Sequence, residues 1–173
     1  FGSLSLLSSL FLKGNNIVIL PESMSKLKNL KYLGLKSNKL ASLPECIGSL
    51  SAIETLSLSS NNLTALPKSI GRLKSLIKLE VSNNTLTSLT ETIGNAYSLI
   101  DLTLDRNMIS SIPETIGNLK KLESLNLASN HLIYIPDSLG SMESLKELNF
   151  YENNIETLPS SLGDLSSLEI LDL

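Results

Sequence analysis

Residues 30–50 read LKYLGLKSNKLASLPECIGSL, and the rest of the chain repeats this pattern. The apolar positions of the stretch are Leu30, Leu33, Leu35, Leu40, Leu43, Ile47 and Leu50. An asparagine holds one fixed place in the pattern and returns every 23 residues, at Asn15, Asn38, Asn61, Asn84, Asn107, Asn130 and Asn153. A fixed period of this length predicts a solenoid, in which repeats stack on one another and bury a shared core. We therefore expect residues 1–173 to form a single array of about seven repeats.

Two hydrophobic periods alternate within each repeat. In residues 33–35 a leucine stands on each side of Gly34, so both leucines would face the same side of a strand. This alternation is typical of a short strand with one buried face. Ile47, Leu50 and Ile53 are three residues apart, which is typical of a 3₁₀ or helical turn. Pro44 is expected at the first position of that turn, where its fixed φ and missing N–H cost little. Each repeat is therefore predicted to contain one strand and one short helical turn.

Two further positions predict how neighbouring repeats meet. Gly48 stands where the helical turn ends, and it indicates either a close approach of two backbones or a positive φ. The recurring asparagine offers both donors and an acceptor, so its amide is expected to bond to its own loop and to the next one. Stacking buries those loops, where an unpaired backbone group costs about 1–3 kcal/mol. We therefore interpret the seven asparagines as a structural ladder rather than as surface turn residues.

The pattern LxxLxLxxNxLxxLPxxIGxL resembles the leucine-rich repeat, and the resemblance covers the whole chain. It implies a right-handed α/β solenoid with a parallel sheet on the concave side and short 3₁₀ or helical turns on the convex side. The 23-residue LPxxIGxL form is similar to the intracellular repeats of Ras-suppressor, Scribble-type, plant Ras-group and Roco proteins. Plant receptor ectodomains typically have repeats of about 24 residues with LxGxIP, whereas Ala41 and Thr64 hold the glycine position of that motif here. The resemblance thus implies a cytoplasmic scaffold that binds a signalling protein, such as a small GTPase, a phosphatase or a kinase.

One repeat departs from the pattern, and both ends of the sequence fall within a repeat. In the repeat of Asn84, Thr90 replaces the proline and Ala96 falls where leucine is expected, which marks either a local change in curvature or a tolerated irregular repeat. Residues 1–4 fall on the Ile-Gly-x-Leu phase of a preceding repeat, and residues 168–173 begin an eighth strand. Because a solenoid needs polar-faced terminal repeats for solubility, we expect the array to be uncapped at both ends and to be a segment of a longer protein.

Composition argues against several other functions. The net charge of −3 gives no case for nucleic-acid binding, and no run approaches the roughly 18 apolar residues that cross a bilayer, so no membrane insertion is expected. Cys46 is the only cysteine and His131 the only histidine, so we expect no internal disulfide, zinc site or nucleophile–base pair. Asp101 and Asp105 are interpreted as ordinary surface charges rather than as a metal or acid–base pair. We predict no enzyme activity, no metal and no cofactor.

Charge is unevenly distributed along the chain. Residues 1–86 hold ten Lys or Arg and four Asp or Glu, whereas residues 87–173 hold four and thirteen. Because a solenoid lays its sequence out along its axis, the array is expected to be basic in its first half, net +6, and acidic in its second half, net −9. This asymmetry is either a drift in surface composition or a means of steering a partner with complementary ends.

The resemblance places four variable residues of each repeat on the concave face: two alternate with the strand leucines and two precede the asparagine. Aromatic and arginine side chains often dominate interfaces, so Phe11, Tyr32 and Tyr151 are candidate anchors, although exposed aromatics also occur without a partner. The first choice of binding cluster is Tyr151 beside Arg106, Asn126 and Asn149. The predicted partner-binding residues are Tyr32, Lys36, Asp101, Asp105, Arg106, Asn126, Asn149, Tyr151 and Glu152.

The sequence leaves three functional hypotheses open. The leading one is an intracellular scaffold that binds a protein on its concave face. The second is an extracellular recognition ectodomain, which a signal peptide and cysteine-rich caps in the flanking sequence would favour. The third is a regulatory segment of a multidomain kinase or GTPase, which catalytic motifs outside residues 1–173 would establish.

Overall fold

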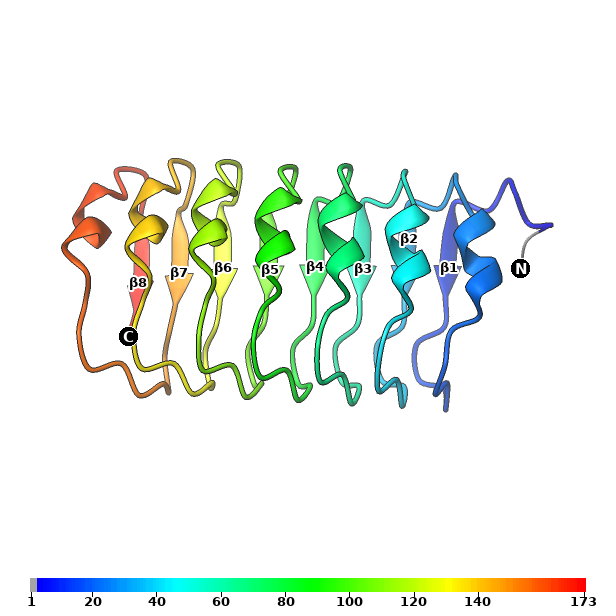
Figure 1. The fold of residues 1–173 in the computed structure, drawn as a ribbon, viewed down its shortest axis with the longest axis horizontal. Helices are drawn as coiled ribbons and strands as arrows, with labels where there is room; N and C mark the ends of the chain where they lie inside the picture. Colours follow the sequence, from blue (N-terminus) through cyan, green and yellow to red (C-terminus); the bar gives the residue numbers. More distant parts are fainter. Residues whose placement is uncertain (1–2) are drawn as a thin grey trace.

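Every 23-residue repeat becomes one turn of a coil in the computed structural model, which describes residues 3–173 (Figure 1). A turn contains a strand of 3 residues, a 3₁₀ helix of 5 residues and the loops that join them. The strands lie side by side along one side of the rod, and the helices lie along the opposite side. Phe1 and Gly2, which belong to the predicted partial repeat, lie outside the described residues.

Within residues 3–173 the strands form one 8-stranded sheet whose order follows the chain. The strands are β1 Ser9–Phe11, β2 Tyr32–Gly34, β3 Thr55–Ser57, β4 Lys78–Glu80, β5 Asp101–Thr103, β6 Ser124–Asn126, β7 Glu147–Asn149 and β8 Ile170–Asp172. The 3₁₀ helices are η1 Glu22–Lys26, η2 Glu45–Ser49, η3 Lys68–Arg72, η4 Glu91–Asn95, η5 Glu114–Asn118, η6 Asp137–Ser141 and η7 Ser160–Asp164. All neighbouring strands are parallel, and equivalent leucines pair directly, as Leu33 does with Leu56. The predicted right-handed solenoid with a parallel sheet and short helical turns is therefore confirmed, including its eighth strand.

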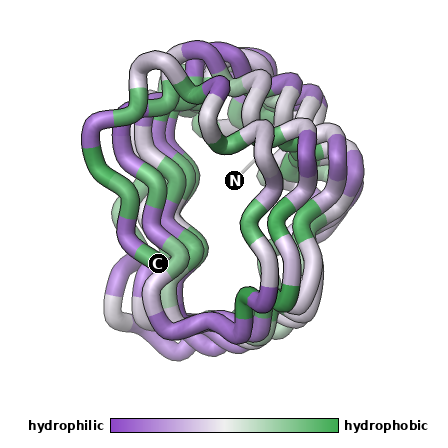
Figure 2. The backbone as a smooth tube through the Cα atoms, turned by 90° about the vertical axis from the view of Figure 1, so that its left-hand side faces the viewer, coloured by the Kyte–Doolittle hydropathy of each residue, from purple (hydrophilic) through white to green (hydrophobic). Residues whose placement is uncertain are grey.

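The leucine and isoleucine positions of the repeat form the core between the sheet and the helices. Leu33, Leu56 and Leu79 on consecutive strands are buried, as are Ile47 and Ile70 on consecutive helices. Viewed along the rod, hydrophobic positions of successive turns line up in continuous columns (Figure 2). Since each repeat buries its apolar side chains against its neighbours, the repeats are stable only together.

The proline of each repeat precedes the 3₁₀ helix rather than occupying its first position. Pro44 is extended, with φ −70° and ψ 149°, and η2 begins one residue later. Its carbonyl oxygen accepts the Ile47 N–H at 3.0 Å, so proline caps the helix through its backbone. Thr90 has nearly the same conformation, and its carbonyl oxygen accepts the Ile93 N–H at 3.0 Å. The repeat without proline is thus a tolerated variant with an ordinary helix start.

The glycine near the end of each helix permits a close approach of two neighbouring backbones, which is the first of the two alternatives given for Gly48. A Cβ atom on Gly48 would lie 2.6 Å from the carbonyl oxygen of Ser69 in the next helix. A Cβ atom on Gly94 would overlap the carbonyl oxygen of Thr115. Among the described residues only Gly14 combines glycine with a positive φ, so close packing of neighbouring helices explains the recurrence.

The recurring asparagines form an amide ladder whose bonds run toward the preceding repeat. Asn61 Nδ2 donates to the carbonyl oxygen of Leu58 in its own loop at 2.9 Å and to that of Leu35 at 3.0 Å. Asn61 Oδ1 accepts the Leu40 N–H at 3.0 Å. The same pattern holds for Asn38, Asn84, Asn107, Asn130 and Asn153. The expected bond to the next loop is wrong in direction. The amide bonds instead to a carbonyl oxygen and an N–H group of the preceding repeat, as Asn61 does with Leu35 and Leu40.

Asn15 differs from the other six asparagines. It is exposed, and among residues 3–173 its amide bonds only to the carbonyl oxygens of Leu12 and Lys13 in its own loop. The residues that the other amides reach lie 21 and 26 positions earlier, which for Asn15 is before residue 1. Asn15 is therefore seen only with the bonds to its own loop, and its place in the ladder between repeats stays a prediction.

The residue before each ladder asparagine has a left-handed backbone, which sequence reasoning missed. The values of φ lie between 54° and 58° at Ser37, Ser60, Asn83, Arg106, Ser129 and Glu152. This conformation costs a residue with a Cβ about 1–2 kcal/mol. Gly14, at the equivalent position of the first repeat, has φ 74° and is the one clear sequence signal of the turn.

Candidate partner-binding face

The side of the sheet away from the core carries the positions that change from repeat to repeat. We call this surface the sheet face and define it by four residues of each repeat: the two that alternate with the strand leucines and the two that directly precede the asparagine. From β2 to β7 they are Tyr32, Gly34, Lys36, Ser37, Thr55, Ser57, Ser59, Ser60, Lys78, Glu80, Ser82, Asn83, Asp101, Thr103, Asp105, Arg106, Ser124, Asn126, Ala128, Ser129, Glu147, Asn149, Tyr151 and Glu152. The core columns are chemically uniform, whereas the residues of the sheet face change from repeat to repeat.

The first part of the sheet face is an aromatic shelf with a neighbouring cation. The ring centroids of Phe11 and Tyr32 are 4.7 Å apart, with an angle of 33° between the ring planes. Tyr32 lies over Gly34, because a Cβ atom there would be 2.9 Å from Tyr32 Cε1. The predicted anchor Tyr32 is thus half-buried against the sheet, whereas Phe11 is 72% exposed. Lys36 stands exposed on the loop after β2.

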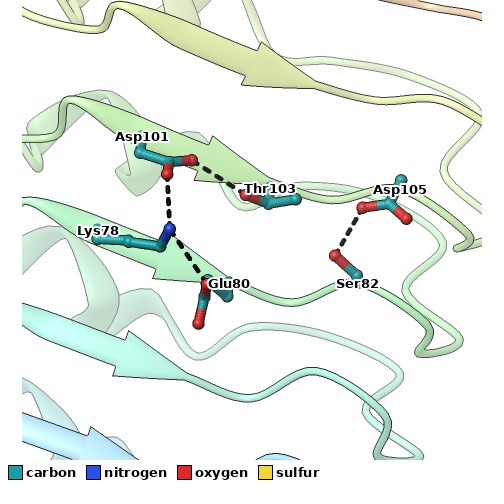
Figure 3. Close-up of polar contacts among 6 residues, drawn as sticks. All are labelled: Lys78, Glu80, Ser82, Asp101, Thr103 and Asp105. Carbon is teal, nitrogen blue, oxygen red and sulfur yellow. Dashed lines mark hydrogen bonds and ion pairs between the residues drawn. The ribbon is translucent and has the colours of Figure 1, made fainter.

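An ionic network occupies the centre of the sheet face (Figure 3). Lys78 Nζ lies 3.2 Å from Glu80 Oε1 and 2.9 Å from Asp101 Oδ2. The Thr103 hydroxyl donates to Asp101 Oδ1 at 3.0 Å. The hydrogen bond to Asp101, with that to Glu80, raises the pKa of the Lys78 ammonium. The predicted binding residue Asp101 is therefore engaged with its neighbours and fixes the side chains around it.

Beside this network the sheet face is hollowed into a depression of about 270 Å³. Its lining residues are Lys36, Ser59, Ser60, Glu80, Ser82, Asn83, Thr103, Asp105 and Arg106. The structure thus brings the predicted residues Lys36, Asp105 and Arg106 around one hollow. Sequence reasoning missed Ser60 and Asn83. The signal that could have indicated the hollow is the run of small residues after β3 and β4, which lies between repeats that carry the long charged residues Lys36 and Arg106.

The last part of the sheet face is rich in amides. Asn126 on β6 pairs in register with Asn149 on β7. Asn149 Oδ1 accepts the Tyr151 N–H at 2.8 Å, and Asn126 Oδ1 accepts the Ala128 N–H at 3.0 Å. Both predicted amides therefore hold the chain where it leaves its strand. Tyr151 is 51% exposed, which leaves its ring accessible to a partner.

The predicted cluster of Arg106 with Tyr151 is divided in the structure. Arg106 lines the central depression, whereas Tyr151 lies two repeats further along the sheet face. The predicted residue Glu152 accepts the Ser129 hydroxyl at 2.7 Å, between these two places. The spacing along the chain tells in which repeat a residue lies. Arg106 and Tyr151 do not meet, because the side chains of one whole repeat lie between them on the sheet face.

The two residues considered for reactive chemistry lie on different elements. Cys46 is half-buried on η2, where desolvation raises the pKa of its thiol, and His131 is exposed on the loop after β6. Within residues 3–173, no group of three or more His, Cys, Asp or Glu side chains is placed to hold a metal ion. No helix in that range is long and apolar enough to cross a membrane.

Two family models match the chain. The model described as "Leucine-rich repeat region" matches residues 20–105, and the model described as "Leucine Rich Repeat" matches residues 121–142 and 144–165. Together they cover most of the sequence. No curated protein gave a match.

Solved structures show the same architecture. A leucine-rich-repeat protein from Leptospira interrogans is 37% identical, with a TM-score of 0.96 over 99% of this chain and 44% of that chain. The functional domain of InlJ from Listeria monocytogenes is 27% identical, with a TM-score of 0.84 over 99% of this chain and 35% of that one. The plant peptide hormone receptor RGFR1 in complex with RGF2 is 33% identical, with a TM-score of 0.73 over 99% of this chain and 33% of that one. The chain thus spans less than half of each of these proteins.

Proposed function

The chain belongs to the leucine-rich-repeat family, and from that premise we propose that it is a scaffold segment that binds a partner protein on its sheet face. Leucine-rich repeats are typical protein-interaction modules. The observation that carries the proposal is the contrast between the two sides of the sheet. The core side repeats the same leucines, whereas the sheet face presents an aromatic shelf, a charged centre and an amide-rich end.

We further propose that the partner is an intracellular signalling protein, such as a small GTPase, a phosphatase or a kinase, and that the chain acts in the cytoplasm. The support is the 23-residue LPxxIGxL form, which is similar to intracellular repeats. The opposite charges of the two halves support a partner with complementary ends.

A capture experiment with matched variants tests the sheet face. The double variant Tyr151→Ala/Arg106→Ala removes an aromatic and a cation from the sheet face, both of them exposed. The control Tyr97→Ala/Arg72→Ala removes the same residue types from the helix side, where both are also exposed. The immobilised variants are incubated with extract from the source cells, and captured proteins are quantified by mass spectrometry.

We expect at least one protein whose capture falls with the sheet-face variant and persists with the helix-side control. Thermal unfolding of both variants is expected to stay within about 0.5 kcal/mol of the parent, because exposed surface substitutions rarely cost more. Equal capture by both variants for every protein recovered would contradict the proposal.

A second candidate function is recognition outside the cell. It is favoured by the likeness to RGFR1, which was solved in complex with RGF2. The LPxxIGxL form, in place of LxGxIP, argues for the intracellular alternative. Fractionation of the tagged native protein separates the two: recovery from the cell surface or the medium supports the ectodomain, and recovery from the cytosol supports the scaffold.

A further inference from the structure

The central depression of the sheet face exists because small side chains lie between long charged ones. Ser59, Ser60 and Ser82 follow two consecutive strands, with Lys36 on one side and Arg106 on the other. Because a serine reaches less far from the backbone than a lysine or an arginine, the surface is lower there. The hollow is therefore built into the sheet face by residue size.

The floor of the depression contains a hydroxyl that has no partner. Ser59 is 7% exposed and lines the hollow, yet its hydroxyl forms no hydrogen bond within the part of the chain that the structure describes. Among the described residues, the buried side-chain atoms that lack a hydrogen-bond partner belong to Ser69 and Ser138, so the Ser59 hydroxyl oxygen is open to the hollow. This hydroxyl is therefore free to bond to a polar ligand there.

Four of the other lining residues, Glu80, Ser82, Thr103 and Asp105, offer hydrogen-bond acceptors to the hollow. The Ser82 hydroxyl donates to Asp105 Oδ1 at 2.6 Å, and the Thr103 hydroxyl donates to Asp101 Oδ1 at 3.0 Å (Figure 3). With these protons committed, both hydroxyl oxygens present lone pairs to the hollow. Glu80 uses Oε1 for Lys78, so its second oxygen is available as well. A ligand that contacts these four residues must carry several donors.

We propose that the depression binds an arginine side chain of the partner protein, a proposal that rests on the proposed binding function of the sheet face. A guanidinium presents five N–H donors in a flat fork, which matches two carboxylates and several hydroxyl oxygens better than a single ammonium does. Lys36 and Arg106 also line the depression, and their positive charges repel an arginine that has no acidic neighbours. We therefore expect acidic residues on both sides of the partner's arginine, with their carboxylates close to Lys36 and Arg106.

A peptide titration tests this site without the natural partner. The probe is acetyl-Glu-Arg-Glu-amide, and the control probe is acetyl-Glu-Gln-Glu-amide, which keeps the flanking acids and removes the guanidinium. Both are titrated into the ¹⁵N-labelled chain and followed by NMR. We expect saturable shifts of the backbone amides of Ser59, Ser82 and Thr103 with the arginine probe, and binding at least tenfold weaker with the glutamine probe.

Matched variants separate the site from the overall charge of the protein. Glu80→Gln/Asp105→Asn removes the two carboxylates of the depression, and we expect it to weaken binding of the arginine probe at least tenfold. Glu143→Gln/Asp164→Asn makes the same charge change on the helix side, where both residues are exposed, and should bind as the parent does. Circular dichroism checks that both variants are folded.

Two outcomes would overturn the inference: equal binding of the two probes, or binding that both double variants weaken alike. Neither outcome touches the proposed function by itself. If capture of a partner still depends on Tyr151 and Arg106 while the arginine probe ignores Glu80 and Asp105, the sheet face binds protein but the depression does not take arginine.

Discussion

The interior repeats and the two end repeats share one pattern but use it differently. Asn84 is buried and bonds to three carbonyl oxygens and one N–H, whereas Asn15, at the same place in the first repeat, is exposed. Gly94 packs against the next helix, whereas Gly163, at the same place in the last repeat, has open space around it. An identical residue at an identical place in the repeat thus acquires its energetic importance only from a neighbouring repeat.

The largest effect is expected from the ladder. Asn84→Ala leaves the carbonyl oxygens of Leu58 and Val81 and the N–H of Leu63 without their amide partner. We expect it to lower the free energy of unfolding by about 3 kcal/mol, measured by urea denaturation. Asn15→Ala should cost less than about 0.5 kcal/mol, because its groups are exposed to water. Similar losses in the two variants would break the contrast between interior and end.

The next effect concerns the glycine column. In Gly94→Ala the added methyl group overlaps the carbonyl oxygen of Thr115, so we expect a loss of about 2 kcal/mol from overpacking. Gly163→Ala adds the same methyl group where no atom lies within 4 Å, and it is expected to be neutral or slightly stabilising. Thermal unfolding of the two variants compares them directly, and a destabilised Gly163 variant would show that something other than helix contact matters.

A smaller effect, of opposite sign, is expected at the left-handed turn. Ser37 has φ 58°, whereas the first repeat has Gly14 with φ 74° at this place. Ser37→Gly relieves a conformation that disfavours a Cβ, but it also loosens the unfolded chain, so the net gain should be about 0.5 kcal/mol. Ser57→Gly on β3, where φ is not positive, should instead cost about 0.5–1 kcal/mol. Loss of stability in the Ser37 variant would contradict the strain argument.

The smallest effect is a dependence of stability on pH. Glu45 accepts the N–H groups of Lys68 and Ser69 in the next repeat at 3.1 and 2.9 Å, and hydrogen bonding to Ser69 is the main cause of its lowered pKa. A carboxyl with a lowered folded pKa contributes stability above its unfolded value of 4.5, and this contribution is lost as the pH falls through the folded value.

The variant Glu45→Gln isolates this contribution. Melting temperatures recorded between about pH 3 and about pH 6 should show a shallower acid-induced fall than in the parent. The difference is expected to be small, since the carboxylate is largely solvated and water screens its interactions. Parallel curves for the two proteins would remove Glu45 as a link between repeats.

The sequence predicted which residues lie on the sheet face, but it did not predict which of them lie close together. The resemblance to the leucine-rich repeat implied that Lys36, Asp105 and Arg106 share one face, and the structure brings all three to the central depression. The pairing of Arg106 with Tyr151 did not follow, because two repeats separate them. Whether charged residues from different repeats meet depends on the size of the side chains between them, which here are serines.

The sequence by itself determined the period, the parallel sheet, the short helical turns and the identity of the core columns, because a repeat with one buried face has few ways to stack. Only the tertiary structure decided the backward direction of the amide bonds, the left-handed residue before each asparagine and the depression lined by Ser59. These features depend on which atoms of adjacent repeats come within reach of one another, and a linear pattern does not contain those distances.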